Sequence, residues 1–401
     1  DIAKHINKIR KKYGFPAHVT LWDSKNTTSR NIKISEVLED KSGYIAIQST
    51  DLSVLNNSGR GNIKFDGLKQ RLLDYKDKSK ETQTDILIGL AGETSKSHMK
   101  TLRDSFDLGF DIIQPYNIRL LPGTDYESEE QRKLYGIGTR FRLIFGSYGI
   151  YGNKLAFEIE ESVRSTKDMS EDELESFKIP HWLIYFCWNI GIFKPILKYA
   201  FKELKVNPMD VLLHILRTKN SNLGKLFSSM ESESLSEWFD TRDELIRYYN
   251  NDKNRSKLKE FKKLNAWWIA KLYRNSILLN NLYDDMVSYI EKIMLKKDLN
   301  DIVWDEIKSV NLQLLCFGNL SRVEQSDPIS IHGKTLFYLN KNSKYIDKSN
   351  VNIYIYRSNK SAQWWSYYLG SESYSNISTN KFLSAIESGG SSKLLNSIDV
   401  Y

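Results

Sequence analysis

The stretch Thr84-Asp-Ile-Leu-Ile-Gly-Leu-Ala-Gly-Glu-Thr94, with the segment from Ser95 to Leu108 that follows it, decides the fold class of this chain. Mostly apolar residues lead into a turn that contains glycine and an acid, and the segment after the turn has the spacing of an amphipathic helix. This succession predicts a buried parallel strand, a βα loop and a helix that packs on the strand.

Further short apolar runs, at residues 19–22, 44–49 and 110–115, flank this unit. Single helical segments separate them, which predicts parallel strands joined by right-handed crossovers. In such sheets, chemistry takes place where the strands end. Position alone therefore identifies a set of candidate site residues at the strand ends and in the loops beyond them: Gln48, Ser49, Asp85, Glu93, Gln114 and Tyr116.

The patterning divides the chain into four regions. Residues 1–126 predict an α/β fold whose few strands form only the later part of a TIM-like barrel, and the opening helix from Ile2 lacks a preceding strand, so we expect an N-terminally truncated chain. Residues 127–169 predict a barrel-capping extension, with two strands, or a strand and a helix start, around a glycine-rich turn at 146–152. Residues 170–325 predict a mainly helical region. Residues 326–401 predict a small α+β region that is rich in strands, with apolar runs at 336–339 and 351–356.

Composition excludes several function classes. The 401 residues carry a net charge of +8, but basic and acidic residues are mixed, so we expect no nucleic-acid partner. The longest apolar run, residues 182–193, is too short to span a bilayer, and secretory or transit signals are absent. Cys187 and Cys316 lie in apolar runs, which predicts buried thiols in a reducing compartment, and we expect a cytoplasmic protein.

Three polar residues suggest one kind of ligand. Gln48 ends a strand, Arg60 lies in the loop beyond it, and Asp85 lies on the strand that follows in the chain. A guanidinium group holds a carboxylate, whereas amide and carboxylate oxygens accept hydrogen bonds from hydroxyls, so the set suits a zwitterionic ligand with a ribose. The alternative is that Asp85 caps the strand entry and Arg60 lies on the surface, and the residues alone leave both interpretations open. The sequence contains no zinc-site spacing, Walker A loop or G-x-S-x-G motif.

Several blocks in a fixed order carry a specific resemblance. They are Lys25-Asn26, then Ile47-Gln-Ser-Thr-Asp-Leu-Ser-Val-Leu55 with Arg60-Gly-Asn62, then residues 84–94, then Ile113-Gln-Pro-Tyr-Asn-Ile-Arg-Leu-Leu-Pro-Gly-Thr124. In this order they resemble the later part of a radical SAM core, in the subgroup of cobalamin-binding radical SAM proteins, over about residues 1–170. Ala91 departs from the family's usual proline, while the flanking glycine and acid remain.

The resemblance assigns roles to these residues. Gln48 and Asp85 are expected to contact the ribose region of S-adenosylmethionine, and Arg60 is expected to face its methionyl carboxylate. The turn from Gly89 to Glu93 and residues 113–116 are expected near the adenine and the substrate, and Ser49 joins the cofactor-binding set. The family's C-x-x-x-C-x-x-C motif, which holds a 4Fe-4S cluster, does not occur in this sequence, and the expected truncation explains its absence. We therefore expect no metal ligand in this chain.

The resemblance implies a fragment of a radical SAM enzyme that is inactive alone. The cluster would cleave S-adenosylmethionine to a 5′-deoxyadenosyl radical, which abstracts hydrogen from a substrate that the sequence does not identify. An external electron donor is then needed, and where cobalamin is used the implied reaction is methyl transfer to an unactivated carbon. Two rivals remain open: a cofactor-free interaction protein on a degenerate half-barrel, and a barrel lyase without a cluster.

Overall fold

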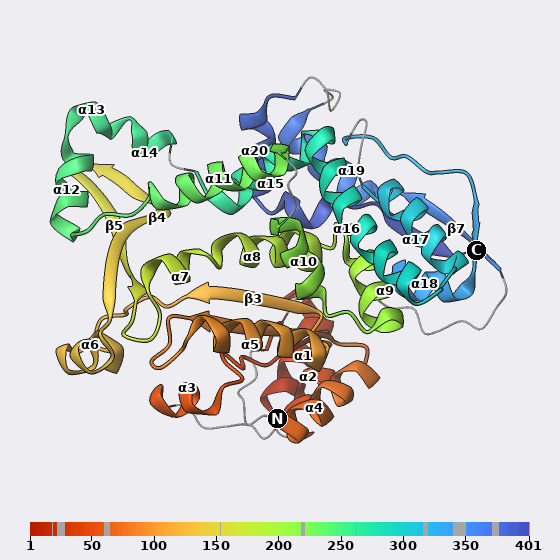
Figure 1. Cartoon of the computed structure of the whole chain (residues 1–401), viewed down its shortest axis with the longest axis horizontal. Helices are drawn as coiled ribbons and strands as arrows, with labels where there is room; N and C mark the ends of the chain where they lie inside the picture. Colours follow the sequence, from red (N-terminus) through yellow and green to blue (C-terminus); the bar gives the residue numbers. More distant parts are fainter. Residues whose placement is uncertain are drawn as a thin grey trace. The chain divides into compact units, whose positions relative to one another are not determined.

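The structure is a computed structural model, and it describes residues 1–17, 19–21, 29–59, 65–152, 154–217, 221–260, 262–315, 320–339, 350–370 and 377–400. The chain folds into two compact units (Figure 1). Unit 1 comprises Asp1–Arg140 and Glu161–Phe177, and unit 2 comprises Phe141–Glu160 and Lys178–Tyr401.

Unit 1 is built on a parallel sheet whose strands lie in the order β1 (Ser42–Tyr44), β2 (Glu81–Ile88) and β3 (Ile112–Asn117). Its helices are α1 (Ile2–Tyr13), α2 (Ser29–Val37), α3 (Leu52–Asn57), α4 (Phe65–Asp77), α5 (Ser95–Leu108), η1 (Asp125–Glu127), α6 (Glu129–Tyr135) and α7 (Glu171–Glu175). The mixed α/β class is thereby confirmed. The described strands of unit 1 form an open sheet, so the partial barrel stays a prediction.

The β2–α5 unit forms as its sequence predicts. Alternate residues of β2 are buried, which is the pattern of a strand with one face in the core. Thr94 caps the start of α5 with a capping box: its side chain accepts a hydrogen bond from the Ser97 N–H, and the Ser97 side chain accepts one from the Thr94 N–H. Gly109 ends the helix with a φ of 84°, a backbone conformation that favours glycine. Leu102 and Phe106 bury the inner face of α5.

The strand expected at residues 19–22 is absent from its described part. Residues 19–21 have no strand pairing, and the Leu21 N–H donates instead to Asp40 Oδ2, at 3.1 Å. The other oxygen of Asp40 accepts from the Ser42 N–H at the start of β1, at 3.1 Å. A side chain thus takes the hydrogen bond that a neighbouring strand would have made, so this expectation was wrong for residues 19–21, while Trp22 lies outside the described residues.

The glycine-rich turn expected at residues 146–152 is mostly strand. β4 (Gly138–Tyr151) and β5 (Lys154–Ser165) form a two-stranded sheet, and β4 runs through all but the last residue of that stretch. A Cβ atom on Gly149 would lie 3.0 Å from the ring of Tyr151. Close packing inside the strand, and not a turn, therefore accounts for this glycine, and the turn prediction was wrong for residues 146–151.

The part of unit 2 that follows β5 is mainly helical. Its elements are α8 (Lys178–Leu183), a π-helical turn η2 (Ile184–Asn189), α9 (Lys194–Leu204), α10 (Pro208–Arg217), α11 (Ser221–Leu235), α12 (Arg242–Asn250), α13 (Asp252–Arg255), α14 (Lys257–Glu260), α15 (Leu264–Tyr273), α16 (Ser276–Lys296) and α17 (Ile302–Gln313). Across the described residues, every helix is too short or too polar to cross a membrane.

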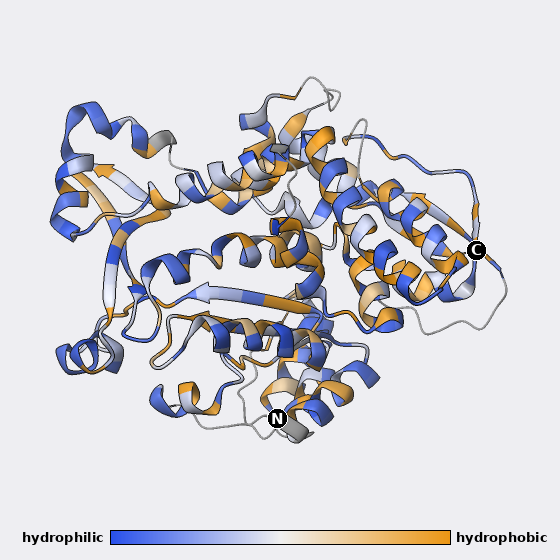
Figure 2. Cartoon of the chain, in the orientation of Figure 1, coloured by the Kyte–Doolittle hydropathy of each residue, from blue (hydrophilic) through white to orange (hydrophobic). Residues whose placement is uncertain are grey.

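Burial in unit 2 follows hydropathy. In Figure 2 most of α10 is hydrophobic, and this helix buries Met209, Val211, Leu212 and Ile215, whereas α13 is hydrophilic and has no buried residue. Cys187 in η2 is completely buried, as expected from its apolar neighbours. Cys316 lies outside the described residues.

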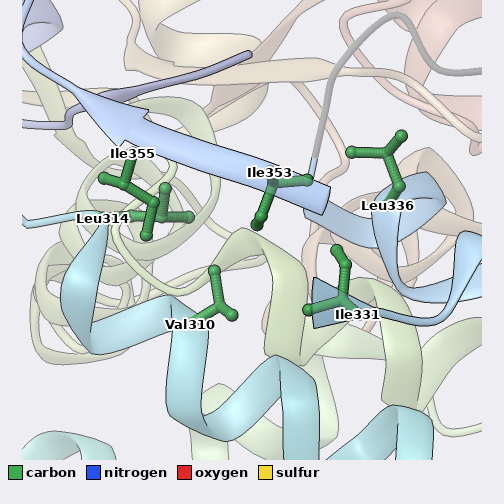
Figure 3. Close-up of a cluster of buried hydrophobic side chains, with 6 residues drawn as sticks. All are labelled: Val310, Leu314, Ile331, Leu336, Ile353 and Ile355. Carbon is green, nitrogen blue, oxygen red and sulfur yellow. The ribbon is translucent and has the colours of Figure 1, made fainter. Parts of the chain in front are cut away.

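The end of unit 2 combines an antiparallel sheet with helices. The strands lie in the order β6 (Ile329–Ile331), β7 (Val351–Tyr356) and β8 (Ser397–Val400), and the helices are α18 (Gly333–Leu339), α19 (Asn359–Leu369), α20 (Thr379–Glu387) and the short η4 (Gly390–Lys393). Figure 3 shows the apolar cluster between this sheet and the end of α17: Val310, Leu314, Ile331, Leu336, Ile353 and Ile355. Residues 351–356 are a strand as predicted, but the run 336–339 is part of a helix, because four apolar residues fit either structure.

Candidate functional site

The sheet of unit 1 has one buried face and one polar face. On β2 the even-numbered residues 82–88 are buried, whereas Gln83 and Asp85 point to the opposite face and are half-buried. In the parallel register, Tyr44 of β1 pairs with Gln83, and Gln114 of β3 pairs with Asp85. Tyr116, two residues beyond Gln114, shares its face. We call these five residues the polar face.

Asp85 lies at the centre of the polar face. The Tyr44 hydroxyl donates a hydrogen bond to Asp85 Oδ2. Asp85 Oδ1 is buried and has no hydrogen-bond partner among the described residues. Burial raises the pKa of the Asp85 carboxyl above its ordinary value, and the bond from Tyr44 opposes this shift. One carboxylate oxygen is thus held by the protein, and the other remains able to accept a hydrogen bond.

Gln48 reaches β2 through a bulge in the first strand. Tyr44 pairs with Gln83 but Gln48 bridges to Ile86, so the first strand contains one more residue than β2 between these points. Gln48 adopts a φ of 65°, in the left-handed region. The Ile47 N–H, displaced from the regular ladder, donates to Thr84 Oγ1 at 3.2 Å.

The bulge brings Gln48 next to Asp85. The Gln48 N–H donates to the Asp85 carbonyl oxygen at 2.9 Å, and the Gln48 carbonyl accepts from the Leu87 N–H at 3.0 Å. Gln48 Oε1 is buried and, like Asp85 Oδ1, lacks a hydrogen-bond partner among the described residues. Buried polar atoms without partners are rare in folded proteins, because each costs about 1–3 kcal/mol. Gln48 and Asp85 are thus backbone-bonded neighbours, and each has a buried side-chain oxygen without a hydrogen-bond partner among the described residues.

On β3, Tyr116 and Gln114 bond to each other. The Tyr116 hydroxyl donates to Gln114 Oε1, which leaves the amide nitrogen of Gln114 as the group that can donate. Tyr116 is exposed, and Gln114 is half-buried. This part of the polar face therefore offers a donor beside the acceptor of Asp85.

The turn after β2 is held by Glu93. Its Oε2 accepts from the Gly89 N–H at 2.9 Å and from the Leu90 N–H at 3.3 Å, and its Oε1 lies 2.9 Å from His98 Nδ1. Glu93 and His98 are both buried. Gly89 has a φ of 94°, and a Cβ there would lie 3.0 Å from a methyl carbon of Val163. Both oxygens of Glu93 are thus engaged within the chain, and Glu93 shapes the turn that ends β2.

Ser49 lies on the other side of the sheet from the polar face. It is buried, its hydroxyl lies 3.3 Å from Thr101 Oγ1 of α5, and it accepts from the Asp51 N–H at 3.1 Å. The structure therefore brings Gln48, Asp85, Gln114 and Tyr116 together and holds Ser49 against α5. Arg60 and Lys25-Asn26 lie outside the described residues.

Tyr44 and Gln83 are the members of the polar face that position at strand ends does not identify. A usable signal was present in the sequence. Tyr44 begins the strand predicted at residues 44–49. Gln83 directly precedes the predicted stretch 84–94 and lies two residues before Asp85, a spacing that puts both on one face of a strand.

The described residues contain no group of three or more side chains that could hold a metal ion. Complete burial raises the pKa of the Cys187 thiol, so this cysteine is a core residue and not an exposed thiolate ligand. A 4Fe-4S cluster therefore does not fit the described residues.

Comparison with known proteins identifies related enzymes. The chain is 26% identical over 144 residues to TokK of Streptomyces tokunonensis, a cobalamin-dependent radical SAM methyltransferase. This alignment covers 35% of the chain and 21% of TokK. It is 26% identical over 179 residues to the 2-(S-pantetheinyl)-carbapenam-3-carboxylate methyltransferase of Streptantibioticus cattleyicolor. That alignment covers 43% of the chain and 26% of the enzyme. The matches thus span about a fifth to a quarter of the length of these relatives.

Two further comparisons add little. No protein-family model matches the chain. The solved structure of TsrM from Kitasatospora setae, a radical S-adenosylmethionine methyltransferase, aligns with a TM-score of 0.30 and 12% identity over 37% of this chain and 30% of TsrM, which is too low to establish a shared fold. The two sequence relatives agree with the family that the order of the motifs predicts. The chain is therefore related to the cobalamin-binding radical SAM methyltransferases.

Proposed function

We propose that this chain is part of a radical SAM methyltransferase and that its polar face, together with Gln48, binds the adenosyl end of S-adenosylmethionine. The observation that carries the proposal is the pair of buried acceptors, Gln48 Oε1 and Asp85 Oδ1, that lack partners among the described residues. A ribose presents two adjacent hydroxyl groups, and each can donate one hydrogen bond. A bound ribose would thereby give both Gln48 Oε1 and Asp85 Oδ1 a hydrogen-bond donor.

The remaining groups suit the rest of an adenosine. The Gln114 amide nitrogen supplies a donor, and the exposed ring of Tyr116 supplies an aromatic surface beside it. Adenine offers ring nitrogens as acceptors and a flat face for stacking. When bound, S-adenosylmethionine supplies the adenosyl and methyl groups for the chemistry, while the residues of this chain bind and orient the nucleoside.

The proposal does not assign cluster or cobalamin ligands to this chain. Substrate, electron donor and turnover belong to the larger enzymes, of which the matches span only about a fifth to a quarter. The role that we propose is thus limited to binding.

Calorimetric titration of S-adenosylmethionine into the 401-residue chain tests the proposal. We expect saturable binding that Asp85→Ala weakens about tenfold or more and Gln48→Ala weakens about three- to tenfold, because bonds to charged groups are stronger than bonds between neutral groups. Asp77→Ala is the matched control, since Asp77 is an exposed carboxylate at the end of α4 in the same unit. It should leave the affinity unchanged.

A second titration isolates the ribose. Adenosine should bind more tightly than 2′,3′-dideoxyadenosine to the natural chain. The difference in affinity should be smaller in the Asp85→Ala variant, where only Gln48 Oε1 remains to accept from a ribose hydroxyl. If S-adenosylmethionine does not bind, or if Asp85→Ala and Asp77→Ala behave alike, the proposal is wrong. Lack of binding would favour the rival interpretation of a cofactor-free interaction protein.

A further inference from the structure

The bond between Tyr44 and Asp85 joins two strands across the polar face. Tyr44 belongs to β1 and is in register with Gln83, two residues before Asp85 on β2. Its hydroxyl donates to Asp85 Oδ2, while Asp85 Oδ1 is buried with no partner among the described residues. The two oxygens of a carboxylate are chemically equivalent until a donor distinguishes them. Here the tyrosine makes that distinction.

We propose that Tyr44 is a positioning residue whose hydroxyl fixes the Asp85 carboxylate so that Oδ1 is presented to a hydroxyl group of the ligand. This inference rests on the proposed function of the polar face. It adds that recognition of the ribose depends on a side chain that need not touch the ribose itself.

The surroundings of Tyr44 keep its hydroxyl in the donor form. Burial, the bond to Asp85 and the nearby charges of Asp85 and Tyr116 all raise the pKa of Tyr44. The titratable groups that act on Asp85 and its partner therefore come from β1 and β3, the strands on either side of β2. A phenol that keeps its proton can only donate to a carboxylate oxygen, so the polarity of the bond is fixed.

The bond also favours the ionised form of Asp85. A hydrogen bond donated to a carboxylate lowers its pKa, whereas burial raises it, and at Asp85 burial is the larger effect. Without the Tyr44 hydroxyl, the carboxyl group would hold its proton to higher pH. A protonated carboxyl group has lost part of its capacity to accept from a ribose hydroxyl.

The first experiment needs no ligand. Carbon-13 NMR of the carboxyl groups, with the Asp85 signal assigned by its loss in Asp85→Asn, measures the titration midpoint of Asp85 in the natural chain and in Tyr44→Phe. We expect the midpoint to rise by about one pH unit in Tyr44→Phe, a tenfold change in proton affinity. An unchanged midpoint in a folded Tyr44→Phe chain, checked by circular dichroism, would overturn the inference.

The second experiment uses S-adenosylmethionine as the probe. Tyr44→Phe should weaken its binding about three- to tenfold, and should have no further effect when Asp85 is already alanine, because the tyrosine acts through that carboxylate. An equal effect of Tyr44→Phe in both backgrounds would mean that Tyr44 acts independently of Asp85, and would overturn the inference.

The two experiments separate the inference from the proposed function. If the natural chain does not bind S-adenosylmethionine, the proposed function fails, while the NMR result still decides whether Tyr44 controls Asp85. If Asp85→Ala weakens binding and Tyr44→Phe does not, the proposed function stands and the role of Tyr44 is refuted.

Discussion

The backbone of Gln48 predicts an unusual order of stabilities among substitutions at this position. Its φ of 65° lies in the left-handed region, where a Cβ atom is unfavourable and glycine is not. We compare Gln48→Gly with Gln48→Ala. Both variants lose the whole amide side chain, so the difference between them reports the backbone alone.

The magnitude follows from two opposing effects. The left-handed conformation costs a residue with a Cβ roughly 1–2 kcal/mol. Glycine loses more backbone entropy on folding, which costs about 0.5–1 kcal/mol relative to alanine. Gln48→Gly should therefore be more stable than Gln48→Ala by about 1 kcal/mol, or about 2–4 °C in the unfolding midpoint of a domain of 150–250 residues.

The control is Ala46, two residues earlier in the same segment, which has no left-handed backbone. Ala46→Gly should destabilise the chain by about 0.5–1 kcal/mol. Thermal and urea unfolding followed by circular dichroism would measure all three variants. The reasoning is refuted if glycine is less stable than alanine at position 48 as it is at position 46.

Three other predictions concern the charged residues Asp85, Arg60 and Arg142. Because burial raises the pKa of Asp85, affinity for S-adenosylmethionine in calorimetry should increase as the pH rises through that pKa, and Asp85→Asn should make the profile flat. Arg60→Ala, outside the described residues, should weaken binding of S-adenosylmethionine about tenfold or more but leave adenosine binding unchanged, since adenosine has no carboxylate. Arg142 is ion-paired with the buried Glu160 and, at 2.9 Å, with Glu237, so Arg142→Met should lower the free energy of unfolding by about 3–5 kcal/mol; an unchanged urea midpoint would contradict this.

Strong periodicity made part of the fold predictable. The β2–α5 unit combines an alternating strand, a Thr94 cap and a terminating Gly109, so local and global preferences agree. Asp85 and Gln114, chosen as candidates for strand ends, lie in the middle of β2 and β3, and the parallel register pairs them on one face of the sheet. Gln48 bonds to the backbone of Asp85.

The features that escaped prediction depend on contacts between distant residues. The bulge before Gln48 shifts the register by one residue, and nothing in the local sequence signals such a shift. The hydrogen bonds of the Glu93 carboxylate depend on His98 and on backbone N–H groups of its own turn. From the sequence alone, Gly149 is typical of a turn. The packing that favours a glycine there, against the ring of Tyr151, becomes apparent only in the folded strand.

Two features that cost stability occur together at Gln48 and Asp85: a left-handed backbone and buried acceptors without partners among the described residues. Gln48 adopts a left-handed backbone that glycine would adopt without strain, and its side-chain oxygen and that of Asp85 are buried without partners among the described residues. Because folding raises the pKa of Asp85, the stability that its protonated form contributes is present at low pH and is lost as the pH rises through that pKa. Selection for stability alone would remove both features. A ligand that donates hydrogen bonds to both oxygens would offset their cost and stabilise the folded chain in proportion to its concentration above Kd, which makes ligand binding the simplest reason for a sequence to retain them.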